Sequence, residues 1–206
     1  DGLIDLWAAN FKREDDIYLN NGDDLWDNSF NPLFMSATQD VVAADYNNDG
    51  LLDMFTPGLK MAHGHGPDAQ GYKYTSLLFE NISQDSLVNN NSWLKIDLEG
   101  AQLEILNSGW SENSNKSAIG AKVIVETDAG SYFREIIAGK GHGSMDPLQL
   151  HFGLGSSSYI QNIMIKWPSM DTLTNQPKIS NFDGPINLNE SYKIVENIGF
   201  VGKKGD

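Results

Sequence analysis

Hydrophobic and polar residues alternate along this chain in short runs bounded by Gly, Asn, Asp and Pro. Runs of this kind fall at residues 40–44, 52–55, 93–98, 121–127, 132–137, 148–152 and 160–167. A period of two is typical of half-buried β-strands. In the first ninety residues the sustained three-to-four-residue spacing that predicts helices is nearly absent. The pattern therefore predicts an all-β protein.

One nine-residue segment, Asp45–Asp53, joins two of these runs and spaces its oxygen-bearing side chains as a metal loop does. The candidate ligands are the side chains at positions 1, 3, 5 and 9 and the carbonyl at position 7: Asp45, Asn47, Asp49, Asp53 and Leu51. Calcium takes about six to eight oxygen ligands, and Gly50 permits a sharp turn because it lacks a Cβ. We interpret the segment as a calcium loop. The alternative is an Asn/Asp/Gly-rich turn without a metal, because these residues dominate turns in general.

The flanks of this loop distinguish it from an EF-hand. An EF-hand loop begins in the same way but ends in a bidentate Glu at position 12, where this chain has Thr56. It also lies between two helices, whereas residues 40–44 and 52–55 are short apolar runs that favour strands. We therefore expect the loop to join two strands.

Composition excludes several classes of function. The chain has 206 residues, of which 40% are hydrophobic, and its formal net charge is −14. An acidic balance argues against partners such as nucleic acid and anionic membrane surfaces, which select basic patches. The chain has no cysteine, which excludes disulfides and thiol catalysis. No apolar run has the length of a membrane span, so we expect no membrane insertion.

The beginning of the chain reads as the second half of another calcium loop. Residues 1–5, Asp-Gly-Leu-Ile-Asp, match residues 49–53, so Asp1 and Asp5 are further candidate ligands. The first residue is not an initiator Met, and no signal peptide precedes the loop. We expect that the chain is the C-terminal portion of a longer protein whose export signal lies upstream.

The first ninety residues also contain a repeat. Residues 1–8 parallel 49–56 with an offset of 48, and residues 16–21 parallel 76–81 with an offset of about 60. On these residues the segment resembles the FG-GAP/VCBS repeat family of calcium-binding β-propeller blades. The resemblance implies that the side chains of Asp45, Asn47, Asp49 and Asp53 and the carbonyl of Leu51 bind calcium. It also implies partial propeller blades, about one and a half of them, with open strand edges.

The second half changes character after the polar linker at residues 89–92. Its alternating runs are bracketed by expected turns at residues 128–130, 139–141, 153–155 and 168–169, and they predict a small antiparallel β-sandwich. Over roughly residues 92–196 it resembles the ASPIC/UnbV domain through six motifs: Trp93–Lys95, Ile119–Val123, Arg134–Ile136, Ala138–Gly141, Leu150–Gly155 and Ile165–Ser169. Residues 103–115 depart from that pattern as an insertion. We therefore predict two domains, the C-terminal blades of a calcium-binding propeller at 1–88 and an ASPIC/UnbV-like β-sandwich at 89–206.

These features predict a non-catalytic, calcium-binding adhesion or interaction module that is secreted or on the cell surface, in a bacterial host. His151 lies in a strand without a nucleophile and an orienting acid in a recognisable pattern, so we expect it to be structural. The expected partner is an extracellular protein or a polysaccharide. Two alternatives stay open: an accessory or catalytic propeller subunit of an extracellular enzyme, and a structural subunit that assembles through open strand edges.

Overall fold

The structure is a computed structural model of the chain, and it describes residues 2–9, 15–22, 26–27, 40–57, 76–82, 91–101, 113–141, 143–171 and 173–203. Its regular elements are all β-strands, and no residue in these ranges is helical, which confirms the all-β prediction. Nor do these ranges contain a helix with the length and hydropathy needed to cross a bilayer.

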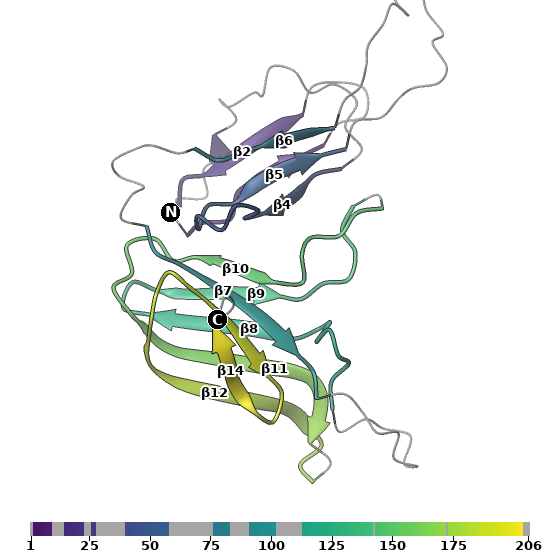
Figure 1. Cartoon of the computed structure of the whole chain (residues 1–206), viewed down its shortest axis with the longest axis vertical. Helices are drawn as coiled ribbons and strands as arrows, with labels where there is room; N and C mark the ends of the chain where they lie inside the picture. The colour runs from purple at the N-terminus through teal and green to yellow at the C-terminus, as the bar shows by residue number, and fades with distance from the viewer. Residues whose placement is uncertain are drawn as a thin grey trace, which may run out of the picture. The chain divides into compact units, whose positions relative to one another are not determined.

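Fourteen strands are described, and they form four small sheets (Figure 1). The strands are β1 (Leu6–Ala8), β2 (Asp16–Asn20), β3 (Trp26–Asp27), β4 (Val42–Ala44), β5 (Asp53–Thr56), β6 (Leu77–Phe79), β7 (Trp93–Glu99), β8 (Lys122–Thr127), β9 (Ser131–Glu135), β10 (Leu150–Gly153), β11 (Ile160–Asp171), β12 (Gln176–Ile186), β13 (Glu190–Val195) and β14 (Gly199–Lys203).

The chain divides into two compact units. The N-terminal unit comprises Leu3–Ile82 and Gly139–Asp146, and the C-terminal unit comprises Asp1–Gly2, Ser83–Ala138 and Pro147–Asp206. The boundary predicted between residues 88 and 89 lies outside the described residues and stays a prediction.

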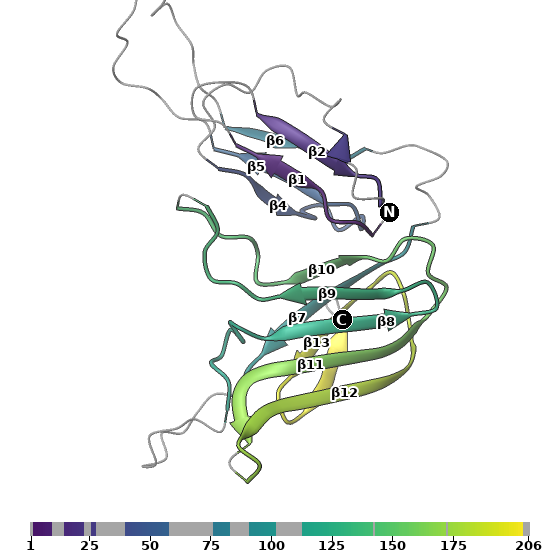
Figure 2. The same ribbon diagram turned by 180° about the vertical axis from the view of Figure 1, so that it is seen from behind.

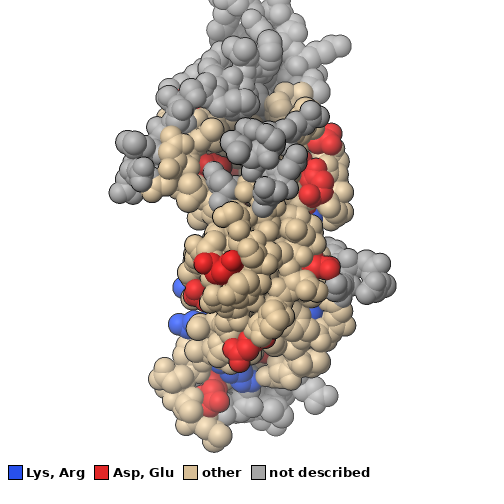
Figure 3. Space-filling view, turned by 90° about the vertical axis from the view of Figure 1, so that its left-hand side faces the viewer, with Lys and Arg blue, Asp and Glu red and all other residues tan. Residues whose placement is uncertain are grey.

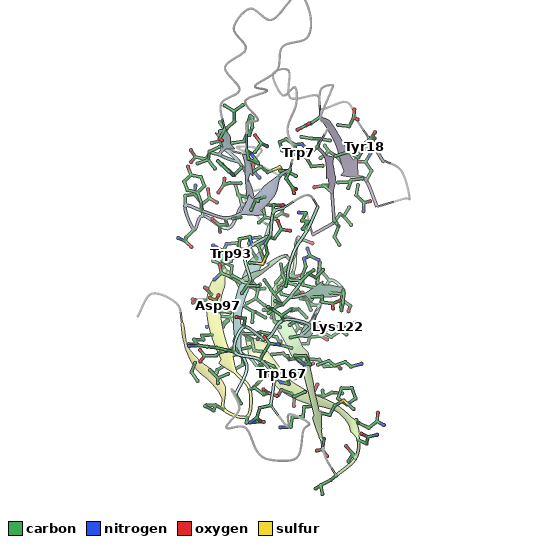
Figure 4. The ribbon with its side chains drawn as sticks, turned by 90° about the vertical axis from the view of Figure 1, so that its right-hand side faces the viewer. Trp7, Tyr18, Trp93, Asp97, Lys122 and Trp167 are labelled. Atoms are coloured by element: carbon green, nitrogen blue, oxygen red, sulfur yellow. The ribbon has the colours of Figure 1, made fainter. Side chains whose placement is uncertain are left out.

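The N-terminal unit contains two three-stranded antiparallel sheets, β1-β2-β3 and β4-β5-β6. The ring centroid of Trp7 of β1, which is labelled in Figure 4, lies 6.1 Å from that of Phe79 of β6, so the two sheets share an apolar contact. The indole N–H of Trp7 donates to the buried carboxylate of Asp15 at 3.0 Å. The N–H of a half-buried tryptophan such as Trp7 usually finds a partner of this kind.

Strand pairing shows the repeat in this unit and corrects its alignment. Leu6 pairs with Tyr18, and Met54 pairs with Phe79. If residue 6 corresponds to residue 54, then residue 18 corresponds to residue 79, an offset of 61. The residue-by-residue match of 16–21 with 76–81 was therefore wrong by one position. The reason is that both segments alternate weakly, and a shift of one residue exchanges the faces of a strand.

The C-terminal unit is a two-sheet sandwich with the sheet orders β10-β7-β13-β14 and β12-β11-β8-β9 (Figures 1 and 2). Alternate residues of both sheets point into one core, which includes Leu94, Ile96, Val123, Phe152 and Ile163, all 0% exposed. Trp167, labelled in Figure 4, is 2% exposed in the same core. Burial of apolar area of this kind provides the main stabilisation of a sandwich.

Two expectations about this sandwich need correction. Strand β13 runs parallel to β7, with Glu190 opposite Leu94 and Val195 opposite Glu99, so this sheet is mixed rather than purely antiparallel. The turn expected at residues 168–169 is absent, because β11 continues to Asp171 through an irregularity between Lys166 and Met170. The pairing of β11 with β8 ends at Lys166, which lies opposite the first residue of β8, Lys122, and β11 continues beyond it through Pro168.

Candidate metal-binding loop

The candidate loop connects β4 to β5 in an antiparallel hairpin, as the flanking runs predicted. Ala44 pairs with Asp53 at the base of the hairpin, and residues 45–52 form the turn above it. Asn48 and Gly50 have φ angles of 62° and 90°. Asn and Gly are the residues that adopt this left-handed region most readily, so the sequence suits the curl of the loop.

The polar side chains of the loop accept hydrogen bonds from its own backbone. Asp45 accepts from the N–H groups of Asp49 at 3.1 Å and Gly50 at 2.9 Å. Asn47 Oδ1 accepts from the Asp49 N–H at 3.1 Å, and Asp49 Oδ1 accepts from Leu51 N–H at 2.8 Å. These bonds bring the side chains at positions 1, 3 and 5 to the inner side of one short loop.

Asp53, at position 9, ties the hairpin to the end of the third strand. Its side chain is 1% exposed, Oδ2 accepts from Tyr46 N–H at 3.1 Å, and Oδ1 accepts from Asn81 N–H at 2.8 Å. Asn81 in turn donates its side-chain amide to the Leu52 carbonyl at 3.3 Å. This aspartate therefore has a structural role whether or not a metal is bound.

Glu80, which the sequence analysis did not identify, lies beside the same loop. The side-chain amide of Asn47 donates to Asp49 Oδ2 at 2.9 Å and to Glu80 Oε1 at 3.3 Å. Partial desolvation and the carboxylates of Glu80, Asp53 and Asp49 together raise the pKa of the Tyr46 hydroxyl. The loop thus has a negative potential to which the third strand contributes. The only sequence feature that could have pointed to Glu80 is its position directly before Asn81, at the end of an apolar run that predicts a strand.

The half-loop at the start of the chain shows part of the same geometry. Asp5 Oδ1 accepts from Asn20 N–H at 2.9 Å, as Asp53 Oδ1 does from Asn81. Gly2 has a φ of 94°, close to the 90° of Gly50. Asp1 lies outside the described residues, so its role as a ligand stays a prediction.

The donor set of the complete loop fits a hard cation in its chemistry. Every candidate group is an oxygen, and a carboxylate oxygen that accepts one N–H keeps capacity for a further partner. In the part of the chain that the structure describes, however, no three His, Asp or Glu side chains are grouped closely enough to share an ion. The carboxylates are turned instead toward the N–H groups of the loop. The ligand assignments of Asp45, Asn47, Asp49, Leu51, Asp53 and Asp5 accordingly stay predictions.

His151 lies on the outer side of the sandwich sheet beside β7. Its ring stacks on Trp93, with centroids 6.5 Å apart and an interplanar angle of 13°. The ammonium of Lys95, whose side chain is 1% exposed, lies 5.1 Å from the Trp93 ring centroid. His151 and Lys95 thus both contact the ring of Trp93.

Charge on the described surface is mainly acidic. On the face shown in Figure 3, Asp and Glu side chains occur in several separate groups, and Lys and Arg are fewer. Described ion pairs include Lys193–Glu99 at 2.6 Å and Lys140–Asp146 at 2.8 Å. This distribution agrees with the sequence charge of −14.

Two protein families match different parts of the chain. Residues 1–56 match the FG-GAP-like repeat, and residues 111–197 match the family described as ASPIC and UnbV. These matches confirm both resemblances that the sequence motifs indicated. A search of curated proteins found no match to the chain.

Proposed function

Because the chain carries an FG-GAP-like repeat followed by an ASPIC/UnbV domain, we propose that it is a calcium-stabilised, non-catalytic binding module that works outside the cell. The observation that carries this proposal is the β4–β5 loop. Within nine residues its sequence contains three aspartates and an asparagine at alternate or near-alternate positions, and Glu80 lies beside it.

Calcium would be held by the side chains of Asp45, Asn47, Asp49 and Asp53 and by the carbonyl of Leu51. When bound, the ion offsets the repulsion between carboxylates that the hairpin brings together. The N–H groups of Asp49, Gly50 and Leu51 hold the side chains of Asp45 and Asp49 within the loop, and the proposal requires these carboxylates to turn toward the ion when it binds. The affinity expected for an extracellular module is weak, on the order of 10⁻⁴–10⁻³ M.

The binding role rests on rigidity and charge. The sandwich presents its loops from well-packed strands, and binding residues are commonly found on loops held in this way. The acidic surface favours a partner other than nucleic acid, and we propose an extracellular protein or a polysaccharide. High external calcium would keep such a weak site filled.

Thermal unfolding with and without a chelator tests the calcium proposal. With the ion at about ten times its Kd, binding adds about 1.4 kcal/mol to the free energy of unfolding. For a chain of this size that raises the melting temperature by about 3–6 °C. Isothermal titration calorimetry on the same protein should show saturable calcium binding.

The sharpest variant is Asp49→Asn, because the amide keeps an acceptor for Leu51 N–H while it removes the charge. We expect this variant to melt like the wild type in chelator and to lose the gain that calcium provides. Asp183→Asn is the control, because Asp183 accepts from Asn162 at 3.1 Å on the sandwich, outside the loop. The proposal is wrong if the wild-type protein has the same melting temperature with calcium as with chelator and its titration with calcium shows no heat of binding.

A further inference from the structure

The chain contains a fully buried carboxylate that the calcium proposal does not use. Glu196 directly follows β13, and its side chain is 1% exposed. Its backbone N–H donates to the Glu99 carbonyl at 2.9 Å, which extends the parallel pairing of β13 with β7 by one residue. Burying a carboxylate is costly unless its oxygens are hydrogen-bonded. The hydrogen-bond donors around Glu196 must therefore offset the cost of burying its carboxylate.

Three donors from three parts of the sandwich surround this carboxylate. Glu196 Oε2 accepts from Ala101 N–H at 3.0 Å and from Ser114 N–H at 2.7 Å. Glu196 Oε1 accepts a short hydrogen bond from the Ser169 hydroxyl. Ala101 follows β7, Ser114 precedes β8, and Ser169 lies on β11, so the donors come from both sheets.

The backbone builds this cluster of donors without help from the Glu196 side chain. Gly100 N–H donates to the Lys116 carbonyl at 3.0 Å. A Cβ at residue 100 would lie 2.0 Å from the Asn115 carbonyl oxygen and 2.6 Å from that of Ser114. The two segments thus approach closely enough that only glycine fits. Ala101 and Ser114 are brought together by backbone packing, with both N–H groups directed at one oxygen.

The site also has a donor that Glu196 does not use. The Ser114 hydroxyl is buried, the residue being 2% exposed, and it has no hydrogen-bond partner within the described ranges. An unsatisfied buried hydroxyl is uncommon and costs stability. Two N–H groups and two hydroxyls in one buried place are the donor set that a carboxylate oxygen pair selects.

We propose that Ala101, Ser114 and Ser169 form a built carboxylate-binding cradle, which Glu196 occupies as an internal ligand. The contact latches the hairpin of β13 and β14 onto the other sheet of the sandwich. The ligand class of the cradle is a small carboxylate, and removal of the Glu196 side chain opens the cradle to formate or acetate from solution.

Chemical rescue of Glu196→Ala in the whole chain tests this proposal. The truncation leaves buried N–H groups unsatisfied, so we expect the melting temperature to fall by about 10 °C. Formate should restore part of this loss in a saturable manner, beyond the effect of sodium chloride at the same ionic strength. Formate should not act in this way on the wild type, where the cradle is filled.

The matched control is Glu126→Ala, because that carboxylate accepts a hydrogen bond from the Ser131 hydroxyl at 2.9 Å and is only half-buried. We expect its melting temperature to respond equally to formate and chloride. If formate and chloride act equally on Glu196→Ala as well, the cradle does not bind carboxylates and the proposal is wrong.

Glu196→Gln covers the case in which the alanine variant does not fold. The amide keeps the size of the side chain but opposes a donor with its own N–H, so we expect a smaller loss of melting temperature. Hydrogen exchange at Ala101 and Ser114 should become faster, while exchange at Val125 in the core stays slow. A Glu196→Gln protein with the melting temperature and exchange rates of the wild type would overturn the proposal.

Discussion

Asp53 gives the most direct test of how the N-terminal unit is held together. We consider Asp53→Ala in the presence of a chelator, so that any contribution from calcium is removed. The side chain is 1% exposed and accepts from Tyr46 at 3.1 Å and from Asn81 at 2.8 Å. The first bond closes the hairpin loop, and the second joins β5 to the end of β6.

The magnitude follows from these two bonds. A hydrogen bond to a charged acceptor contributes about 1.5–3 kcal/mol, and the loss of its acceptor leaves a donor unsatisfied. Both donors are partly buried, so we take the lower value for each and expect a loss of about 3 kcal/mol. For a chain of this length the corresponding fall in melting temperature is about 6–12 °C.

The matched comparison is Asp5→Ala. Asp5 makes the equivalent bond to Asn20 N–H at 2.9 Å, but its side chain is exposed. Water replaces an exposed bond at little cost, so we expect a loss of about 1 kcal/mol or less. Asp53→Asn keeps one acceptor oxygen and should fall between Asp53→Ala and the wild type.

Hydrogen exchange as a function of urea, read by mass spectrometry, is the suitable assay because it separates the two units. Peptides that cover residues 15–22 and 76–82 report on the N-terminal unit, and those from β8 and β11 report on the sandwich. Equal stabilities for Asp53→Ala and Asp5→Ala in these N-terminal peptides would refute the argument.

Two further predictions concern the sandwich. Gly100→Ala should lower the free energy of unfolding by more than about 2 kcal/mol, because the new Cβ meets the Asn115 carbonyl at 2.0 Å; urea unfolding measures this, and a loss below about 0.5 kcal/mol would contradict it. Asp128 accepts from Ser158 N–H at 2.9 Å, and this bond lowers the pKa of the carboxyl group. Its contribution is therefore complete above the unfolded pKa of about 3.8 and disappears as the pH falls through the lower folded value. Wild type and Asp128→Ala should differ in melting temperature at pH 6 and converge under strong acid, whereas a difference that grows toward low pH would have the wrong sign.

The sequence predicted several of the strands that bury one face in the core of the sandwich. The runs at 93–98, 121–127 and 160–167 became β7, β8 and the first part of β11 because alternate residues such as Val123 and Ile163 fill the core. The β4–β5 hairpin followed from the Asn, Asp and Gly residues between two apolar runs. Each of these predictions depends only on residues that are close together in the sequence.

The sequence analysis did not predict strand β12, because several of its residues are typical of loops. It contains Pro177, Gly184 and Pro185, which ordinarily predict a loop. The strand nevertheless forms because it is at the edge of its sheet, where only β11 is a neighbour and a missing N–H is tolerated. An edge position depends on tertiary structure, so single-sequence reasoning does not reveal it.

The candidate loop and the site of Glu196 differ in how far apart their residues lie in the sequence. The spacing from Asp45 to Asp53 is visible in nine residues, whereas Glu80 joins that loop only through strand pairing. The partners of Glu196 are even more distant, because Ala101 and Ser114 precede it by 95 and 82 residues. The parallel pairing of β13 with β7 brings them together, and no local pattern indicates such a pairing.

The two prolines of β12 have a consequence for the behaviour of the protein at high concentration. An edge strand with a full row of N–H groups can recruit another chain and begin a growing fibril. Pro177 and Pro185 remove two of the donors that such recruitment needs from this border of the sandwich. The same two residues that hide this strand from sequence-based prediction therefore make the border of the sandwich a poor template for polymerisation.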